Sequence, residues 1–330
     1  MTEVAHHQVD LGGLTLHVAE RGHGPIVMLL HGFPECWYAW RHQFGPLADA
    51  GYRVVAPDLR GYARSGRPDD VGDYTMMHAV GDVIGLVHAL GAEHVVLVGH
   101  DWGAPIAWAT AQMRPDVVRA VAGLSVPPVP RGTISPLTAR RQRYGESFYQ
   151  VYFQRPGKAD LEFAADPHAT FRTLLYWGSG DNPANVPPRP WATSTEGTLL
   201  DTMRNPDVLP AWLSEDDIDV FVEEFAHQGG SPFTGGLNYY RNLDRNWALT
   251  APFARVPIDM PSLFVIGDRD LVMAFPGVLD PLGDTEFLPR LTRTVVLPGC
   301  GHWTQQERPN EVNAALLKFL TEIDSAKQAT

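Results

Sequence analysis

One carboxylate, placed between two glycines where an apolar run meets a helix-like run, is the residue of this sequence best placed for chemistry. The apolar run His94–Val98 leads directly into Gly99-His100-Asp101-Trp102-Gly103, and APIAWATAQM follows at once. This is the pattern of a nucleophile elbow, in which a strained strand-to-helix turn presents its central side chain to a site. The helix N-terminus there favours negative charge, so a carboxylate stays ionised. We therefore expect Asp101 to act as a nucleophile.

A histidine and two carboxylates follow in the chain order that a nucleophile–acid–histidine triad requires. His302 lies in the short loop GCGHW, directly after an apolar run. Asp268 and Asp270 lie in GDRD, after another such run, and either could orient the histidine. Such a set can form an ester on the carboxylate and then activate water to hydrolyse it.

Hydrolysis of such an ester also needs donors for the oxyanion that forms on the carboxylate. The turn His31-Gly32-Phe33-Pro34 follows the apolar run IVMLL and lies in a position to supply one. Pro34 has no N–H, so we expect the backbone N–H groups of Phe33 and Trp102 to form the oxyanion hole.

These residues need a scaffold, and the sequence pattern predicts one. Short β-rich runs alternate with helical stretches, which indicates an α/β fold with a mostly parallel sheet flanked by helices on both faces. We expect helices over Ala79–Leu90 and Trp102–Arg114, and a last helix from Pro309 to near Ile323. The expected strands are Ile26–Leu30, Tyr52–Ala56, His94–Val98, Val118–Leu124, Ser262–Ile266 and Arg293–Leu297.

The alternation stops near residue 126 and returns near residue 251. Between these points lie a proline-rich exit, aromatic residues and helix-like stretches without strand alternation. We therefore predict a core made of 1–129 and 251–330, with a helical cap inserted as 130–250.

Composition narrows the class of protein. The 330 residues are 44% apolar and 19% charged, as expected for a globular chain, and 26 basic against 38 acidic residues give a net charge of −12. That charge disfavours nucleic acid and anionic membranes as partners. Two cysteines and no visible secretion signal favour the cytoplasm. We expect a small-molecule substrate, no metal, no cofactor, and a possible homo-oligomer.

Together these motifs resemble the epoxide hydrolases of the α/β-hydrolase fold, and the likeness extends over both halves of the core and the cap. The cap motifs are the most specific, because esterases and dehalogenases of this fold do not share them. The chain starts directly at the hydrolase core, so we expect no N-terminal phosphatase domain of the kind found in mammalian soluble enzymes. The matching stretches are HGFPECWYAWRHQ, DLRGYARSGRP, GHDWGAPIAW, FYQVYFQRPG, GGLNYYRNLDRNW, GDRDLVM and GCGHWTQQERP.

The resemblance implies roles for individual residues. It makes Asp101 the nucleophile, His302 the base and Asp270 the acid. It also implies two cap tyrosines that bind and protonate the epoxide oxygen, Tyr149 and Tyr240.

Each of these tyrosines has a near neighbour of the same type, Tyr152 and Tyr239. Adjacent helical residues point about 100° apart, so only one of Tyr239 and Tyr240 should face the site. A departure from the commonest family pattern is Ala63, where many relatives have glycine; we expect it to affect only a loop near the core.

The implied reaction is the conversion of an epoxide to a vicinal diol through an ester on Asp101. A haloalkane dehalogenase would use the same nucleophile, but it has no use for paired tyrosine donors, and HGFP lacks the Asn found after HG in one dehalogenase group. A non-catalytic binding protein of this fold should lose a member of the triad, and all three are present.

Overall fold

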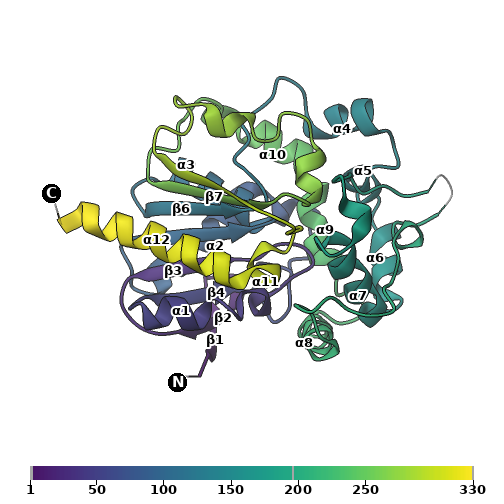
Figure 1. Cartoon of the computed structure of the whole chain (residues 1–330), viewed down its shortest axis with the longest axis horizontal. Coiled ribbons are helices and arrows are strands. Elements are labelled where there is room, and N and C mark those ends of the chain that lie inside the picture. Colours follow the sequence, from purple (N-terminus) through teal and green to yellow (C-terminus); the bar gives the residue numbers. More distant parts are fainter. Residues whose placement is uncertain (1–2, 195–196, 329–330) are drawn as a thin grey trace.

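An eight-stranded sheet forms the centre of the computed structural model, which describes residues 3–194 and 197–328 (Figure 1). The strand order is β1-β2-β4-β3-β5-β6-β7-β8. β2 pairs antiparallel with β1 and β4, and the strands from β4 across to β8 run parallel. The strands are β1 (Ala5–Asp10), β2 (Thr15–Arg21), β3 (Ile26–Leu30), β4 (Arg53–Pro57), β5 (Val95–His100), β6 (Val118–Leu124), β7 (Ser262–Gly267) and β8 (Leu291–Leu297).

The central strands are buried on both faces, which explains why they read as continuous apolar runs. Successive side chains alternate between two cores: Met28 and Leu30 join one cluster, while Val27 and Leu29 join the other. Helices α2 (Met76–Ala89) and α3 (Gly103–Met113) cover the first face. Helices α1 (Phe44–Asp49) and α12 (Pro309–Gln328) cover the second, and Figure 1 shows them in front of the sheet.

Helices α4 to α10 all lie between β6 and β7 in the chain and gather beside one end of the sheet (Figure 1). They occupy the segment for which the sequence predicts a helical cap; its boundaries at 129/130 and 250/251 stay a prediction. These helices are α4 (Pro136–Tyr144), α5 (Tyr149–Tyr152), α6 (Lys158–Ala164), α7 (Pro167–Gly178), α8 (Glu215–Ala226), α9 (Thr234–Arg241) and α10 (Leu243–Leu249). The remaining short helices are η1 (Trp37–Trp40), η2 (Val71–Tyr74), η3 (Pro183–Asn185), η4 (Leu200–Thr202), η5 (Ala251–Phe253), η6 (Leu271–Ala274), η7 (Asp280–Gly283) and α11 (Thr304–Glu307).

The α/β fold is confirmed, and the six expected strands are present with shifts of at most two residues at their ends. The sequence did not predict β1 and β2. β1 alternates between exposed and half-buried residues, so it lacks the dense apolar run of the central strands. Helix α2 begins three residues before the expected start because the Thr75 side chain caps it, accepting from the His78 N–H.

Polar contacts join the cap to the core. Arg64 forms an ion pair with the buried Glu224 of α8, and the Gln228 side-chain amide donates to the carbonyl of Ala63 at 2.7 Å. Ala63 is buried and has a φ of 44°, in the left-handed region that a glycine would enter without strain. The loop around Ala63 is therefore a cap-docking loop as well as a loop near the core.

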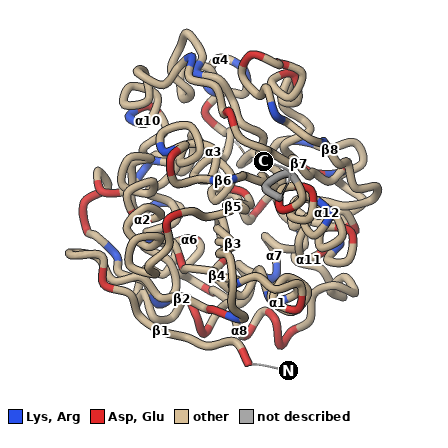
Figure 2. The backbone as a smooth tube through the Cα atoms, turned by 90° about the vertical axis from the view of Figure 1, so that its left-hand side faces the viewer, with Lys and Arg blue, Asp and Glu red and all other residues tan. Residues whose placement is uncertain are grey.

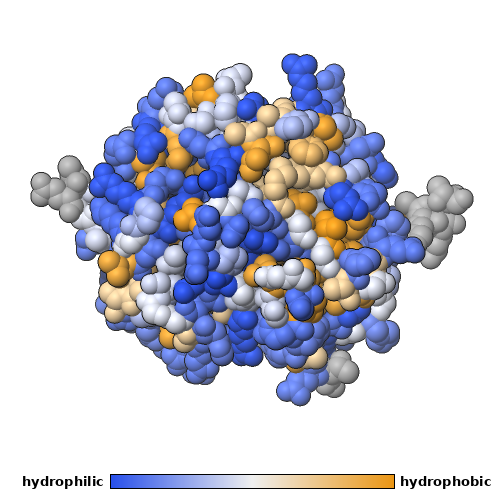
Figure 3. Space-filling view, turned by 180° about the vertical axis from the view of Figure 1, so that it is seen from behind, coloured by the Kyte–Doolittle hydropathy of each residue, from blue (hydrophilic) through white to orange (hydrophobic). Residues whose placement is uncertain are grey.

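Charged residues are spread along the outer helices and loops, whereas β3 and β5 contain no Lys, Arg, Asp or Glu (Figure 2). Seen from behind, the surface is mainly hydrophilic, with apolar side chains exposed in small groups (Figure 3). Within residues 3–194 and 197–328, no helix combines the length and the apolar character needed to cross a bilayer.

The first turn of α9 lies directly against Gly61 in the loop after β4. A Cβ on Gly235 would stand 2.0 Å from the Gly61 carbonyl oxygen, which is a backbone atom and cannot turn aside as a flexible side chain could. We expect Gly235→Ala to lower the free energy of unfolding by about 1–3 kcal/mol, because α9 has to move away from the core. Urea denaturation measures the change.

The matched control is Gly230→Ala, since a Cβ at that exposed position meets nothing within 4 Å. It should change stability by less than about 0.5 kcal/mol. Equal stability of the two variants would show that the Gly61–Gly235 contact does not hold α9.

Candidate active site

Four loops at the carboxyl edge of the parallel strands bring the predicted triad and oxyanion residues together. Phe33 follows β3, Asp101 follows β5, Asp270 follows β7 and His302 follows β8. In parallel sheets this edge is where ligands bind. Residues as far apart in the chain as Phe33 and His302, 269 positions, therefore meet because their strands are parallel and share one sheet.

The turn at Asp101 is as tight as its sequence indicates. Asp101 has a φ of 49°, a strained value for a residue with a Cβ. A Cβ on Gly99 would lie 2.1 Å from the Gly103 carbonyl oxygen, and one on Gly103 would lie 2.0 Å from that of Leu30. Both flanking glycines are thus required by close backbone approach, and helix α3 starts at once behind the carboxylate.

The imidazole of His302 lies between two carboxylates. His302 Nδ1 donates to Asp270 Oδ1 at 2.9 Å, and His302 Nε2 lies 3.3 Å from Asp101 Oδ2. Asp268 is elsewhere: its Oδ1 accepts from the Gly299 N–H in an exposed position. Residue types alone did not decide whether Asp268 or Asp270 contacts His302, and the structure places Asp270 against it.

These charges shift one another. Burial disfavours the imidazolium, but the charges of Asp270 and Asp101, with the hydrogen bond that each forms with His302, outweigh burial and raise the pKa of His302 well above its usual value. Burial also opposes ionisation of Asp101, yet the hydrogen bond and charge of His302, with smaller help from His100 and the Phe33 N–H, lower the pKa of Asp101. Asp101 is therefore ionised at neutral pH.

The two oxygens of Asp101 have different partners. Oδ1 accepts from the Phe33 N–H at 2.7 Å, whereas Oδ2 faces His302. The Phe33 N–H thus stands where an oxyanion on Asp101 would need a donor. Trp102, the residue before α3, lines the same cavity; the role of its N–H stays a prediction.

The cap supplies phenols to the same space. Tyr149 of α5 and Tyr240 of α9 line the cavity with Asp101 and His302, and their rings are 6.0 Å apart. Burial, and next the charge of Asp101, raises the pKa of both phenols, so both keep their protons. They are hydrogen-bond donors.

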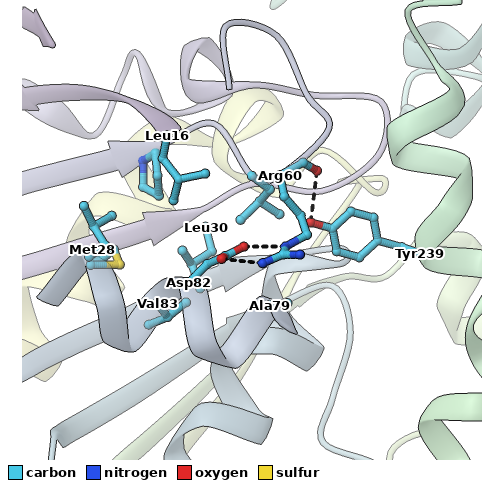
Figure 4. A pocket seen from close by; sticks show the side chains of 11 residues that line it. Leu16, Met28, Leu30, Arg60, Ala79, Asp82, Val83 and Tyr239 are labelled. Atoms are coloured by element: carbon cyan, nitrogen blue, oxygen red, sulfur yellow. Dashed lines mark hydrogen bonds and ion pairs between the residues drawn. The ribbon is translucent and has the colours of Figure 1, made fainter. Parts of the chain in front are cut away.

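The neighbouring tyrosines are engaged elsewhere. The Tyr152 hydroxyl donates to Glu162 at 2.6 Å. The Tyr239 hydroxyl donates to the Arg60 carbonyl at 3.2 Å, while the Arg60 guanidinium pairs with Asp82 (Figure 4). Because Tyr239 is anchored to the core, the next residue of α9, Tyr240, is turned toward Asp101.

The cavity has a volume of about 560 Å³, within the range of small-molecule sites. Its wall is built from both core and cap and is largely apolar. Besides the residues already named, it includes Trp108, Met113, Val126, Ile134, Trp191, Leu243, Phe275 and Val278.

Two buried glutamates that the sequence analysis did not single out support the site. Glu35 accepts from His100 Nδ1 at 2.7 Å, and His100 Nε2 donates to the backbone carbonyl of His302 at 2.7 Å. Glu307 accepts from the N–H groups of Gly301 and Gly180, so it ties the His302 loop to the cap. Burial raises the pKa of Glu307 to about 7. The only sequence signal for either is a charged residue inside a motif, in HGFPE and TQQE.

Comparisons with known proteins agree with this arrangement. Residues 25–309 match the α/β-hydrolase-fold family. The chain is 45% identical to epoxide hydrolase A of Mycobacterium tuberculosis, covering 96% of this chain and 97% of that protein, and 40% identical to epoxide hydrolase 1 of Siraitia grosvenorii, covering 98% and 100%. The structure of an epoxide hydrolase from an endophytic Streptomyces superposes with a TM-score of 0.92 at 42% identity, covering 98% of this chain and 96% of that one.

The charge of Asp101 is one of the causes that raise the pKa of His302, so its removal should be visible. We expect Asp101→Asn to lower the pKa of His302, as followed by NMR titration of the imidazole. The matched control is Asp268→Asn, which removes an exposed carboxylate near Asp270 and should leave the His302 titration in place. An unchanged pKa in Asp101→Asn would show that the two groups are not coupled.

Proposed function

This chain belongs to the epoxide hydrolases of the α/β-hydrolase fold, and we propose that it converts its epoxide to a vicinal diol through a covalent ester on Asp101. The observation that carries this mechanism is the shared cavity. An ionised Asp101, the imidazole of His302 with Asp270 bound behind it, one oxyanion donor and two protonated tyrosines meet at the same space.

The first step is the opening of the ring. Asp101 Oδ1 is held by the Phe33 N–H, so Oδ2 is the oxygen that attacks an epoxide carbon. The carbon–oxygen bond of the ring breaks, and Tyr149 and Tyr240 donate to the departing oxygen. An alkoxide is a poor leaving group, and phenol donors offset that difficulty.

The second step is hydrolysis of the ester. His302, oriented by Asp270, takes a proton from water, and the hydroxide attacks the ester carbonyl carbon. The oxyanion then forms on Oδ1, which the Phe33 N–H already contacts and the Trp102 N–H is proposed to reach. The diol leaves and the carboxylate is restored.

Esterification itself prepares His302 for the second step. In the free enzyme, Asp101 helps to hold the imidazole protonated. Once Asp101 carries the substrate it has no charge, so that contribution is lost and the pKa of His302 falls. The imidazole then releases its proton to solvent and becomes able to accept one from water; it takes a proton back when Asp101 is ionised again.

The alternative with the same nucleophile, a dehalogenase, has less support. A halide ion leaves without a proton, so dehalogenation does not require proton donors. Two protonated phenols with raised pKa values nevertheless lie beside Asp101. We also propose a cytoplasmic location, supported by two buried free cysteines, and a division into core 1–129, cap 130–250 and core 251–330.

A single turnover in heavy-oxygen water tests the ester. We expect the label to enter the Asp101 carboxylate, because the hydroxide attacks the carbonyl carbon, and the first diol to contain no label. Mass spectrometry of the Asp101 peptide and of the diol measures both. Label found only in the diol would mean direct addition of water to the epoxide.

The two carboxylates of GDRD provide a matched pair for testing the acid. We expect Asp270→Asn to slow ester hydrolysis about 10³- to 10⁴-fold, since the imidazole loses the carboxylate that orients it. Asp268→Asn should retain nearly full activity, because its partner is the Gly299 N–H. Stopped-flow measurement of ester decay separates the two, and equal effects would reject Asp270 as the acid.

A further inference from the structure

The phenol of Tyr149 is the end of a chain of hydrogen bonds that begins at a cation. Arg140 of α4 donates through Nε to Gln150 Oε1 at 3.1 Å, and Gln150 Nε2 donates to the Tyr149 oxygen at 2.8 Å. We propose that this Arg140–Gln150 relay aims the Tyr149 O–H into the cavity and makes Tyr149 the phenol that transfers its proton to the epoxide oxygen, while Tyr240 contributes a hydrogen bond. The inference rests on the proposed function.

The direction of the relay is fixed by its first member. A guanidinium can only donate, so the Gln150 amide must turn its oxygen to Arg140 and its NH₂ group to Tyr149. The Tyr149 oxygen therefore accepts from Gln150 and cannot donate to it. Its own proton is left to point elsewhere, and the cavity that holds Asp101 is next to it.

Arg140 is held in place by its surroundings. Its guanidinium lies over the ring of Phe275, 5.5 Å from the centroid, and both residues line the cavity. The Arg140 guanidinium is therefore part of the cavity wall, and its positive charge acts on the Tyr149 phenol through the Gln150 amide.

The other phenol has different neighbours. The ring of Tyr240 packs against the rings of Phe33, Trp102 and Phe153. At Tyr149, Gln150 and then Arg140 act against the rise in pKa that burial and Asp101 cause, whereas at Tyr240 the opposing contribution comes from the neutral Trp102 side chain. Of these two phenols, Tyr149 is therefore the one linked to a cation through a side-chain amide.

A second glutamine fixes the spacing of the two donors. Gln154 Nε2 donates to the backbone carbonyl of Gln150 at 2.7 Å and to that of Tyr240 at 2.9 Å. Helices α5 and α9 are thereby joined beside the two phenols. The relay can bias one of them because their relative placement is already set.

The protons balance over the cycle. When the ring opens, the Tyr149 O–H bond breaks and its proton goes to the oxygen, leaving a phenolate that the Gln150 N–H and Arg140 stabilise. In ester hydrolysis, one proton of the water passes to His302 and the other stays on the new carboxyl group. One of these ends on the second hydroxyl oxygen of the diol, and the other returns to Tyr149. His302 takes back from solvent the proton that it released on esterification.

The relay is tested on ester formation alone, in the His302→Gln background, where the ester accumulates. We expect Gln150→Leu to slow ester formation about tenfold, the effect of losing one charge-assisted hydrogen bond, with little change in the substrate concentration at half-saturation. The fold decrease in the rate of ester formation caused by Gln150→Leu should be unchanged when Tyr240→Phe is also present. It should disappear when Tyr149→Phe is also present. An undiminished loss with Tyr149→Phe would overturn the relay, because Gln150 would then act through packing.

Reversing the polarity of the middle group gives a second test. In Gln150→Glu, the carboxylate would pair with Arg140 and accept from the Tyr149 O–H, so the proton would turn away from the cavity. Ester formation should then fall further than in Gln150→Leu, although the isosteric side chain preserves packing. A rate equal to or above that of Gln150→Leu would contradict the proposed direction.

Arg140→Gln removes the cation and should slow ester formation severalfold. The matched control is Arg143→Gln, an exposed arginine on the same helix whose guanidinium lies near the Tyr144 ring, and it should have no effect. Equal rates for Arg140→Gln and Arg143→Gln would show that Arg140 is not part of the relay.

Failure of the proposed function and failure of the relay give different results. If no ester forms on Asp101 even with the relay intact, the proposed function fails. If the ester forms at a rate that does not depend on Gln150, only the relay fails.

Discussion

The site depends on one buried imidazole placed between two carboxylates. His302 contacts Asp270 through Nδ1 and Asp101 through Nε2, and all three groups are largely removed from water. Two buried negative charges need compensation, and a single imidazolium between them supplies part of it. Two backbone N–H groups add to it, that of Phe33 on Asp101 and that of Val272 on Asp270, both in segments that follow parallel strands. The sheet thus determines where these charges can be accommodated.

The core and the cap divide the chemistry between them. The core holds the carboxylates and the imidazole of the proposed reaction, and the cap holds the two phenols and the guanidinium of Arg140, so these groups meet across the cavity. The position of the cap relative to the core depends on contacts that allow little adjustment. Examples are the close approach of Gly61 to Gly235 and the hydrogen bond from the Tyr239 hydroxyl to the Arg60 carbonyl. A shift of α9 along or about its axis would move Tyr240 away from Asp101, and the close approach of Gly61 and Gly235 leaves no room for a Cβ at this contact.

The sequence predicted the parts of the site that depend on local pattern. Asp101 was identifiable because a dense apolar strand, two glycines and a helix are neighbours in the chain, and His302 because its loop follows a strand. Asp268 and Asp270 could not be separated by residue type, since the choice is made by which side chain reaches His302 across two strands. No sequence pattern indicated a role for Gln150, because an amide next to a tyrosine gains that role only when Arg140, ten residues earlier, folds back against it. Long-range contacts of this kind leave no periodicity in the chain.

The charge of Asp101 connects the two halves of the proposed reaction. While Asp101 is ionised, it raises the pKa of His302 and of both phenols, so all three retain their protons and the phenols are ready to donate. Ester formation removes that charge at the moment when Tyr149 has given up its proton and His302 is needed as a base. The same covalent step therefore favours the phenolate and the neutral imidazole together. No movement of the protein is required for this change, because a negative charge that acts on all three groups disappears from the centre of the cavity.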